Sequence, residues 1–380
     1  MGIVRRIKNK LGVINSAIRV RSEYRKSFIA QVFEMIALRL NKNMVGVDEY
    51  YEFMAYDDNF TNEMKRSFVG WRKETSYGEI LNHKTWNVVT NDKLTAYAIF
   101  SGLNLPYPKI TALYHPYKRE FPGAVCLSEP AELAAYLRNG ISFPFFSKPV
   151  HGASGRNSVA CIAYEESSDS LVLGNGNKID VEEYVAACHP RRGVYPWEAG
   201  FIFQELVKPS SDIADLLGNV VPGMRLIVLN PDGDPKIHRA ILKIPTGDSM
   251  TDNFGKVGET GTIIAELDPE TGTIVRAQHG IAPNIRPLDA HPETGTRLVG
   301  FQIPNWDQYL KVLFYATKAF PGVRLQHWDI AVSDSGPVIF EMNTFGGFGL
   351  PQIATRKGFC DHSFKAFLSK LGEKYPAYKK

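Results

Sequence analysis

The stretch HWDIAVSDSGPVIFEMN (residues 327–343) constrains the fold most, because apolar and polar side chains alternate on both sides of a turn. Period-two alternation predicts two half-buried strands. The letters DSG suit a three-residue hairpin loop in which the glycine adopts a positive φ. This register places Ser333 opposite Pro337 and Asp329 opposite Glu341. We therefore expect an antiparallel hairpin with one apolar and one polar face.

The polar face of this hairpin carries Asp329, Glu341 and Asn343. Two carboxylates that lie directly opposite each other repel unless a cation sits between them. Oxygen ligands suit Mg²⁺ or Mn²⁺. A polar face that simply contacts water explains the same pattern, and the hairpin alone leaves both interpretations open. The other face is expected in the core and contains Trp328, Ile330, Phe340 and Met342.

The composition of the chain is that of an ordinary globular protein. The chain has 380 residues, of which 44% are hydrophobic and 22% charged, as in ordinary globular proteins. A net charge of +4 gives no indication of nucleic-acid binding. The four cysteines show no metal-ligand spacing and predict reduced thiols in a cytoplasmic protein. Strands and helices mix without regular βαβ alternation, and no GxGxxG or P-loop motif is present, so we expect α+β lobes.

Residues 1–27 are strongly basic, with eight Lys or Arg residues and one acid, Glu23. Apolar residues interleave with these charges at roughly helical spacing. A basic amphipathic helix can lie on an anionic membrane surface, which would place the protein at the inner face of the membrane. It can equally dock on the protein itself with its basic side in water, and the sequence leaves both interpretations open.

A lysine in an apolar strand is the second notable feature. Lys148 lies in FPFFSKPV, directly before the small-residue loop HGASGRN. A lysine there is costly unless its ammonium group meets an anion. Gly152 and Gly155 can adopt positive φ, so the loop can present N–H groups to a polyphosphate. A lysine at a strand edge beside a hairpin loop is the alternative interpretation.

Further polar groups follow along the chain. The strand FIFQELV ends in the pair Gln204-Glu205, and the backbone of such a strand end can pair with the edge of a purine. Arg225 and Lys243 lie on two successive predicted strands, where each can face phosphate or developing negative charge. A solvated sheet face explains each of these features singly.

In this order the features resemble the ATP-grasp superfamily, whose D-(x)₁₁-E-x-N pattern matches Asp329, Glu341 and Asn343. The chain is most similar to the sugar-transfer-associated ATP-grasp family over about residues 91–350. The matching segments are MRLIVLN, TDNFGKVG, HPETG, IPNW and WDIAVSDSGPVIFEMN. The resemblance implies an α+β fold in which two lobes clamp ATP. We expect a helical region at residues 1–90, an N-terminal lobe at 91–205 and a C-terminal lobe at 206–380.

The resemblance also implies roles for individual residues. Lys93 and Lys148 would hold the ATP phosphates, and the loop of Gly152, Ser154 and Gly155 would close over them. Gln204 and the backbone of Glu205 and Val207 would hold adenine, and Asp212 would bind the ribose. Lys243 would contact the γ-phosphate, and Arg225 would steady the transferred group. Asp329, Glu341 and Asn343 would hold Mg²⁺ or Mn²⁺.

The function implied by this resemblance is an ATP-dependent ligase that joins a carboxylate to an amine or thiol through an acyl phosphate. Its small-molecule substrates would belong to surface-polysaccharide or sugar-conjugate biosynthesis. A phosphotransferase acting on a sugar or alcohol would need a catalytic base, for which His327, His291 and Asp252 are the candidates. A nucleotide-binding scaffold without turnover is the third alternative. His291, Arg286 and Arg356 are candidates for contact with a substrate.

Overall fold

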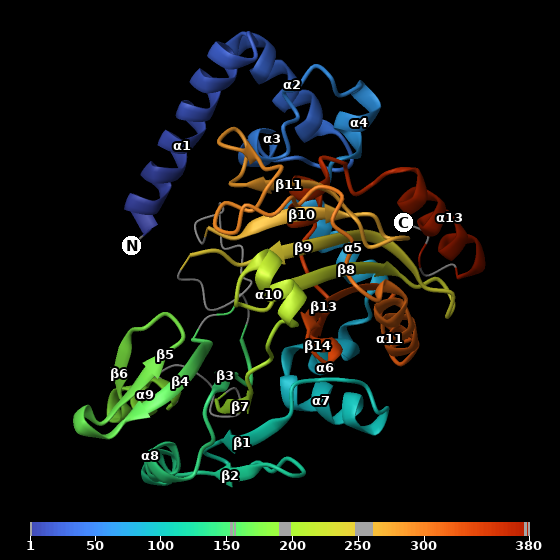
Figure 1. Ribbon diagram of the computed structural model, residues 1–380. Helices are drawn as coiled ribbons and strands as arrows, with labels where there is room; N and C mark the ends of the chain where they lie inside the picture. Colours follow the sequence, from blue (N-terminus) through green and yellow to red (C-terminus); the bar gives the residue numbers. More distant parts are fainter. Residues whose placement is uncertain are drawn as a thin grey trace.

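The computed structural model describes residues 2–152, 155, 157–189, 199–247, 261–375 and 378, with side chains described from residue 11 onwards. Figure 1 shows a helical N-terminal region followed by two sheets, so the predicted α+β class is confirmed. The helices that precede the first strand are α1 (Gly2–Glu23), α2 (Phe28–Leu40), α3 (Val47–Glu52), α4 (Asn62–Ser67), α5 (Trp71–Leu81), α6 (Asn87–Asn91) and α7 (Lys93–Gly102).

The first sheet has seven strands in the order β2-β1-β7-β3-β4-β5-β6. Only the β1–β2 pair is parallel among the strands described in this sheet. Helices α8 (Pro130–Asn139) and α9 (Val181–Cys188) pack on the apolar side chains of one face. The strands are β1 (Ile110–Tyr114), β2 (Val125–Leu127), β3 (Phe145–Pro149), β4 (Val159–Glu165), β5 (Ser170–Leu173), β6 (Lys178–Asp180) and β7 (Phe201–Glu205).

The second sheet also has seven strands, in the order β12-β11-β10-β9-β8-β13-β14, and its pairs are antiparallel. The strands are β8 (Gly223–Leu229), β9 (Lys236–Ile244), β10 (Ile263–Leu267), β11 (Ile274–His279), β12 (Arg286–Pro287), β13 (Leu325–Ser333) and β14 (Gly336–Asn343). The remaining helices are α10 (Ser211–Leu217), α11 (Trp306–Lys318), α12 (Gly349–Thr355) and α13 (His362–Lys374).

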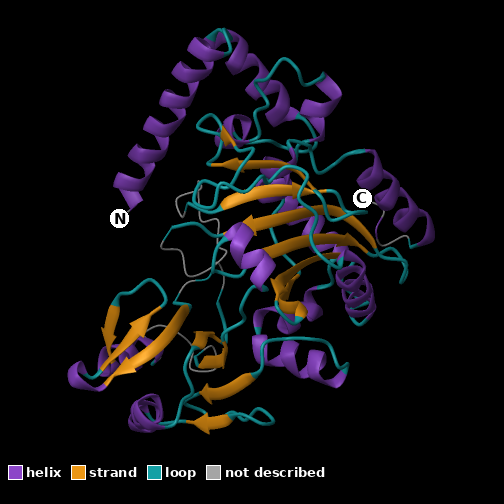
Figure 2. Cartoon of the chain, in the orientation of Figure 1, coloured by secondary structure: helices purple, strands orange, loops and turns teal. Residues whose placement is uncertain are grey.

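Helices cover both faces of the second sheet (Figure 2). One face packs against α6, α7 and α11 in the largest apolar core. The other packs against α1 to α3 around Ile241 and Ile264, and against α5 and α13 around Ile227 and Leu325. Helix α7 therefore packs on the second sheet, although its residues belong to the predicted N-terminal lobe (91–205). The predicted lobe boundaries stay predictions. Within the described part of the chain, no helix is both long and apolar enough to cross a bilayer.

The hairpin of β13 and β14 contains the predicted Asp329–Glu341 pair, but its turn and strand register differ from the prediction. Asp329 does lie opposite Glu341, but Ser333 pairs with Gly336, so the predicted three-residue loop is wrong and only two residues form it. A bulge between Asp329 and Ile330 then adds one residue to β14. The shorter turn and the bulge cancel, which restores the pairing of the carboxylates.

The bulge changes which side chains of β14 enter the core. Ile339 is fully buried in the main core with Ile330 and Met342, whereas Phe340 is half-buried and lines a cleft. The prediction that Phe340 is a core residue is therefore wrong, because an extra residue reverses the alternation of side chains.

This register predicts the relative cost of two truncations. Ile339→Ala should lower the free energy of unfolding by about 2–4 kcal/mol, because it leaves a cavity in the main core. Phe340→Ala should cost clearly less, although it removes a larger side chain, because Phe340 already faces the cleft. Urea denaturation of both variants measures the difference. A larger loss for Phe340→Ala would contradict the bulged register.

Candidate active site

The strands of the second sheet place five polar side chains on the face opposite the main core. Met224 and Leu226 lie in that core, so Arg225 between them points to the other face. The same alternation applies to Lys243 on β9 and to Asp329 on β13. Asp329 pairs with Arg225 on one neighbouring strand and with Glu341 on the other. Period-two geometry therefore gathers cations and carboxylates in one row.

Asp329 is the centre of a buried ionic cluster. Its side chain is 3% exposed, and its carboxylate accepts hydrogen bonds from Arg225 Nε at 3.1 Å and Nη2 at 2.6 Å. Lys243 Nζ donates to Asp329 Oδ1 at 3.0 Å. Burial raises the pKa of Asp329, but the charges of Arg225 and Lys243 outweigh it and hold that pKa below its usual range. The carboxylate is therefore ionised at neutral pH.

Glu341 and Asn343 complete the polar row. Asn343 Nδ2 donates to Glu341 Oε1 at 3.0 Å and lies 3.4 Å from Asp329 Oδ2, so the three side chains meet at one point. All three line the cleft. Two carboxylates and an amide are the oxygen ligands that Mg²⁺ and Mn²⁺ prefer, so this donor set fits a divalent cation.

Two lysines approach the same cleft from α7 and β3. Lys93 Nζ donates to the carbonyl oxygen of Gly152 at 2.9 Å, and Lys148 Nζ donates to the Tyr97 hydroxyl at 2.7 Å. Burial, opposed by the charge of Glu341 and reinforced by the charge of Lys148, lowers the pKa of Lys93 to about 8. An anion bound beside these ammonium groups would relieve this penalty.

The two sheets enclose a cleft of about 650 Å³. Its walls contain predicted site residues from both sheets, and Gly155 has a φ of 63°, the positive value expected from the sequence. The predicted residues that line the cleft are Lys93, Lys148, Gly152, Gly155, Gln204, Glu205, Val207, Arg225, Lys243, Asp329, Glu341 and Asn343. Residues far apart in the sequence thus share one site, while their individual roles stay predictions.

The end of β7 forms another part of this cleft. Gln204 is 1% exposed, and its Nε2 donates to the carbonyl oxygen of Pro108 at 3.0 Å. The N–H of Glu205 donates to Lys109 O at 3.0 Å. Because that N–H is engaged, a purine at this strand end would have to use other backbone groups. Val207 also lines the cleft.

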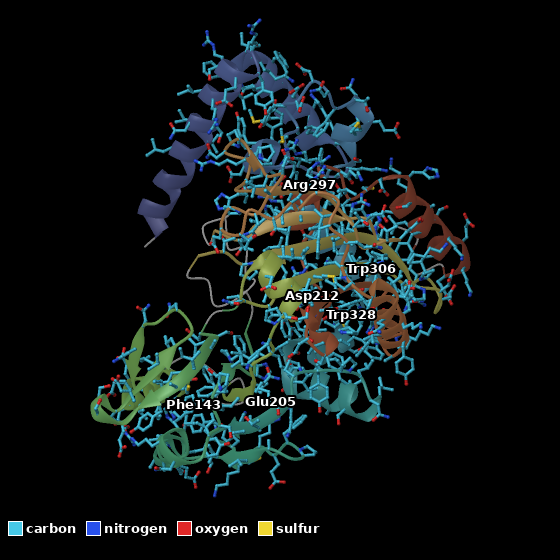
Figure 3. All side chains as sticks on the ribbon, in the orientation of Figure 1. Phe143, Glu205, Asp212, Arg297, Trp306 and Trp328 are labelled. Atoms are coloured by element: carbon cyan, nitrogen blue, oxygen red, sulfur yellow. The ribbon has the colours of Figure 1, made fainter. Side chains whose placement is uncertain are left out.

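Several predicted residues lie elsewhere. Asp212 is exposed on the first turn of α10 (Figure 3) and does not line the cleft. Arg286 is exposed on β12 and Arg356 ends α12, both outside the cleft. Ser154 and the segment TDNFGKVG, with Asp252, lie outside the described residues.

The two candidate histidine bases are also outside the cleft lining. His327 is 1% exposed, and burial together with Arg225 lowers its pKa to about 3. It packs beneath Gly346, where a Cβ atom would overlap the imidazole ring. His291 is also 1% exposed, and its Nδ1 accepts from the N–H groups of Glu293 and Thr294. His291 therefore stabilises the HPETG turn.

The sequence analysis missed several residues that line the cleft or position its side chains. Tyr97 receives the Lys148 hydrogen bond and donates its own to Phe340 O at 2.8 Å, so it positions the lysine. Its signal was the i,i+4 spacing from Lys93 on one helix face. Lys208 directly follows Val207, and that position was its signal. Phe340 and Gly346 line the cleft only because of the bulge and a loop, which the sequence pattern does not reveal.

The buried cluster predicts a stability defect. Asp329→Asn should lower the free energy of unfolding by about 3 kcal/mol or more, because it leaves the charges of Arg225 and Lys243 buried without their anion. Asp215→Asn, at an exposed position of α10, is the matched control and should change it little. Urea denaturation at pH 7 measures both. Equal midpoints for the two variants would contradict the account of this cluster.

Comparison with known proteins agrees with this arrangement. The model of the family described as "Sugar-transfer associated ATP-grasp" matches residues 72–366. No curated protein matches the chain. Among solved structures, the ATP-grasp ligase PsnB with its minimal precursor is 14% identical at a TM-score of 0.38, over 79% of this chain and 69% of that one. D-Alanine-D-alanine ligase from Helicobacter pylori is 11% identical at a TM-score of 0.40, over 76% of this chain and 62% of that one.

The L-amino acid ligase from Bacillus licheniformis is 12% identical at a TM-score of 0.34, over 71% of this chain and 48% of that one. The family assignment rests on the match over residues 72–366, which includes both sheets and all of the cleft residues named above. The resemblance of the sequence motifs to this family is thereby confirmed. This chain belongs to the sugar-transfer associated ATP-grasp family.

Proposed function

We propose that the protein is a Mg-ATP-dependent ligase that joins a carboxylate to an amine or thiol through an acyl phosphate. The observation that carries this proposal is the convergence of Lys93, Lys148, Arg225 and Lys243 on the cleft that also contains the Asp329, Glu341 and Asn343 row. Membership of an ATP-grasp family supports ATP as the phosphoryl donor.

In the proposed reaction the protein supplies positioning and charge. Lys93, Lys148 and Lys243 would bind phosphate oxygens, because each ammonium group is largely buried at the cleft wall and gains from a nearby anion. Glu341 and Asn343, with Asp329, would hold Mg²⁺, which neutralises polyphosphate charge when bound. The guanidinium of Arg225 is oriented by Asp329 and by the carbonyl oxygen of Gly346, and would steady the transferred phosphoryl group.

The chemistry proceeds in two displacements. A carboxylate oxygen of the acid substrate bonds to the γ-phosphorus while the bond from that phosphorus to the β,γ-bridging oxygen breaks, and ADP leaves with the electron pair. An amine nitrogen or thiol sulfur then bonds to the acyl carbon, and inorganic phosphate leaves as the nucleophile gives its proton to solvent. Neither step requires a nucleophilic side chain, because the substrates provide both nucleophiles.

A kinase acting on a hydroxyl group would need a base near the γ-phosphate. Of the three candidates, His327 and His291 do not line the cleft, and burial lowers the pKa of His327 to about 3, while Asp252 lies outside the described residues. The positions of the two histidines support a substrate that is already an anion, such as a carboxylate. A nucleotide-binding scaffold without turnover would need the same buried lysines, and it differs from a ligase in releasing no ADP when an acid is supplied. The description of the family supports substrates from sugar-conjugate biosynthesis.

The products test this proposal directly. The purified protein with Mg-ATP and a panel of sugar acids and amino acids should release ADP and phosphate in equal amounts only when an acid is present. Hydroxylamine should trap the activated acid as a hydroxamate, detected by mass spectrometry. Phosphate found on a sugar hydroxyl instead would identify a kinase. ATP turnover without any acid acceptor would also contradict the ligase proposal.

Glu341 and Asn343 should be required for turnover but not for folding. Glu341→Gln and Asn343→Ala should each lower kcat by about 100-fold or more, because each removes an oxygen ligand beside the transferring phosphate. Melting temperatures should stay close to that of the wild type, since both side chains are only half-buried. Glu183→Gln, at an exposed position of α9, is the matched control. Wild-type turnover in Glu341→Gln would end the assignment of this residue.

A further inference from the structure

Helix α2 exposes an apolar stripe that nothing in the described chain covers. Five bulky side chains recur at positions i, i+3, i+4, i+7 and i+11, which share one helix face. The exposed fractions are 71% for Ile29, 49% for Val32, 69% for Phe33, 50% for Ile36 and 82% for Leu40. A continuous exposed stripe of this kind marks a docking surface in a stable protein.

The opposite face of α2 is fixed to the protein by polar contacts. Gln31 is 1% exposed, and its Oε1 accepts from the Tyr51 hydroxyl at 2.9 Å. Glu34 accepts from Lys26 Nζ at 2.7 Å and from Lys65 Nζ at 2.9 Å. Rotation of the helix to bury the stripe would break these bonds and strand two buried ammonium groups. The outward direction of the stripe is therefore built into the fold.

Helix α1 contributes apolar surface beside α2. Leu11, Ile14 and Ile18 are each 53% exposed, and their spacing of three and four residues places them on one helix face. The guanidinium of Arg21 lies 4.9 Å from the centre of the Phe28 ring, so the two helices meet at their junction. Figure 1 shows α1 and α2 as a hairpin, with α1 projecting from the rest of the molecule.

Positive charge predominates at both ends of the stripe on α2. Arg21 and Arg25 precede the helix and Lys42 follows it, and all three side chains are exposed, while the intervening Glu23 is paired with Arg19. The five positions of the stripe itself carry no charged residue. An apolar stripe between cationic ends matches a lipid surface, because the acyl region accepts the apolar side chains and anionic headgroups meet the cations.

We propose that α1 and α2 form a docking surface for an anionic membrane, with the α2 stripe inserted at the boundary of headgroups and acyl chains. The apolar residues of α2 provide the insertion, and Arg21, Arg25 and Lys42 provide the preference for anionic lipid. In Figure 1, α2 and the β1–β7 sheet lie at opposite ends of the molecule, so docking leaves that sheet uncovered.

Charge favours a membrane over a second copy of this chain. Two α2 stripes packed in parallel would bring Arg21 and Arg25 of both copies together. Antiparallel packing would instead bring these arginines against Lys42. Like charges at an interface repel. An anionic headgroup layer would instead neutralise all three side chains in a single orientation of the protein. The bilayer therefore satisfies both the apolar and the cationic parts of the surface.

Vesicle co-sedimentation of the full chain tests the proposal. The wild type should bind phosphatidylcholine vesicles that contain phosphatidylglycerol and should bind pure phosphatidylcholine much less. Ile29→Gln/Phe33→Gln should weaken binding by about tenfold or more, because it removes two apolar anchors. Arg21→Gln/Arg25→Gln should remove most of the preference for anionic vesicles and the sensitivity of binding to salt.

Tyr315→Gln is the matched control, since Tyr315 is 55% exposed on α11 and should not affect binding. Thermal melting followed by circular dichroism checks that each variant is folded. If Ile29→Gln/Phe33→Gln is unstable, Leu40→Gln at the end of α2 replaces it. Absence of wild-type binding, or equal binding by wild type and stripe variants, would overturn the proposal. A wild-type dimer that dissociates in the stripe variant, without vesicle binding, would assign the surface to self-association.

Discussion

The buried carboxylate of Asp329 is the interaction on which the second sheet and the cleft both depend. It lies between two cations from neighbouring strands, Arg225 on β8 and Lys243 on β9. A buried charge is tolerable only when such partners compensate for lost hydration. A slip of one residue in β13 would turn Asp329 into the apolar core and separate it from both cations. The cluster therefore specifies register as well as charge.

The sequence predicted the Asp329–Glu341 pair correctly through two compensating errors. Gly336 suits a loop of either two or three residues, since both accept its positive φ, so the loop length could not be read from composition. The bulge leaves no mark in the sequence because apolar residues occupy three consecutive positions, 338–340. The alternation of side chains predicted the polar face of the hairpin, but it could not decide which of Ile339 and Phe340 enters the core.

Arg225, Lys243 and Lys148 lie within strands whose alternation decides the face of each side chain, and all three reach the cleft. Asp212 on α10, Arg286 on the two-residue strand β12 and His291 in a turn lie outside the cleft, because their positions depend on how connections run, which local pattern does not encode. Helix α2 is a different case. Its apolar residues lie all around the helix, but only the side with Leu38 and Gln31 is buried.

The charge of the cleft connects the two sheets to the reaction that we propose. Five cationic side chains and three anionic ones line it in the described residues, and the cations come from α7, β3, β8, β9 and the segment after β7. Repulsion between Lys93 on α7 and Lys148 on β3 adds to the effect of burial in lowering the pKa of Lys93. A polyphosphate would reverse the sign of that interaction. We therefore expect the same ammonium groups to make a bound nucleotide a bridge between the sheets, and the enclosed site would exclude water from an acyl phosphate.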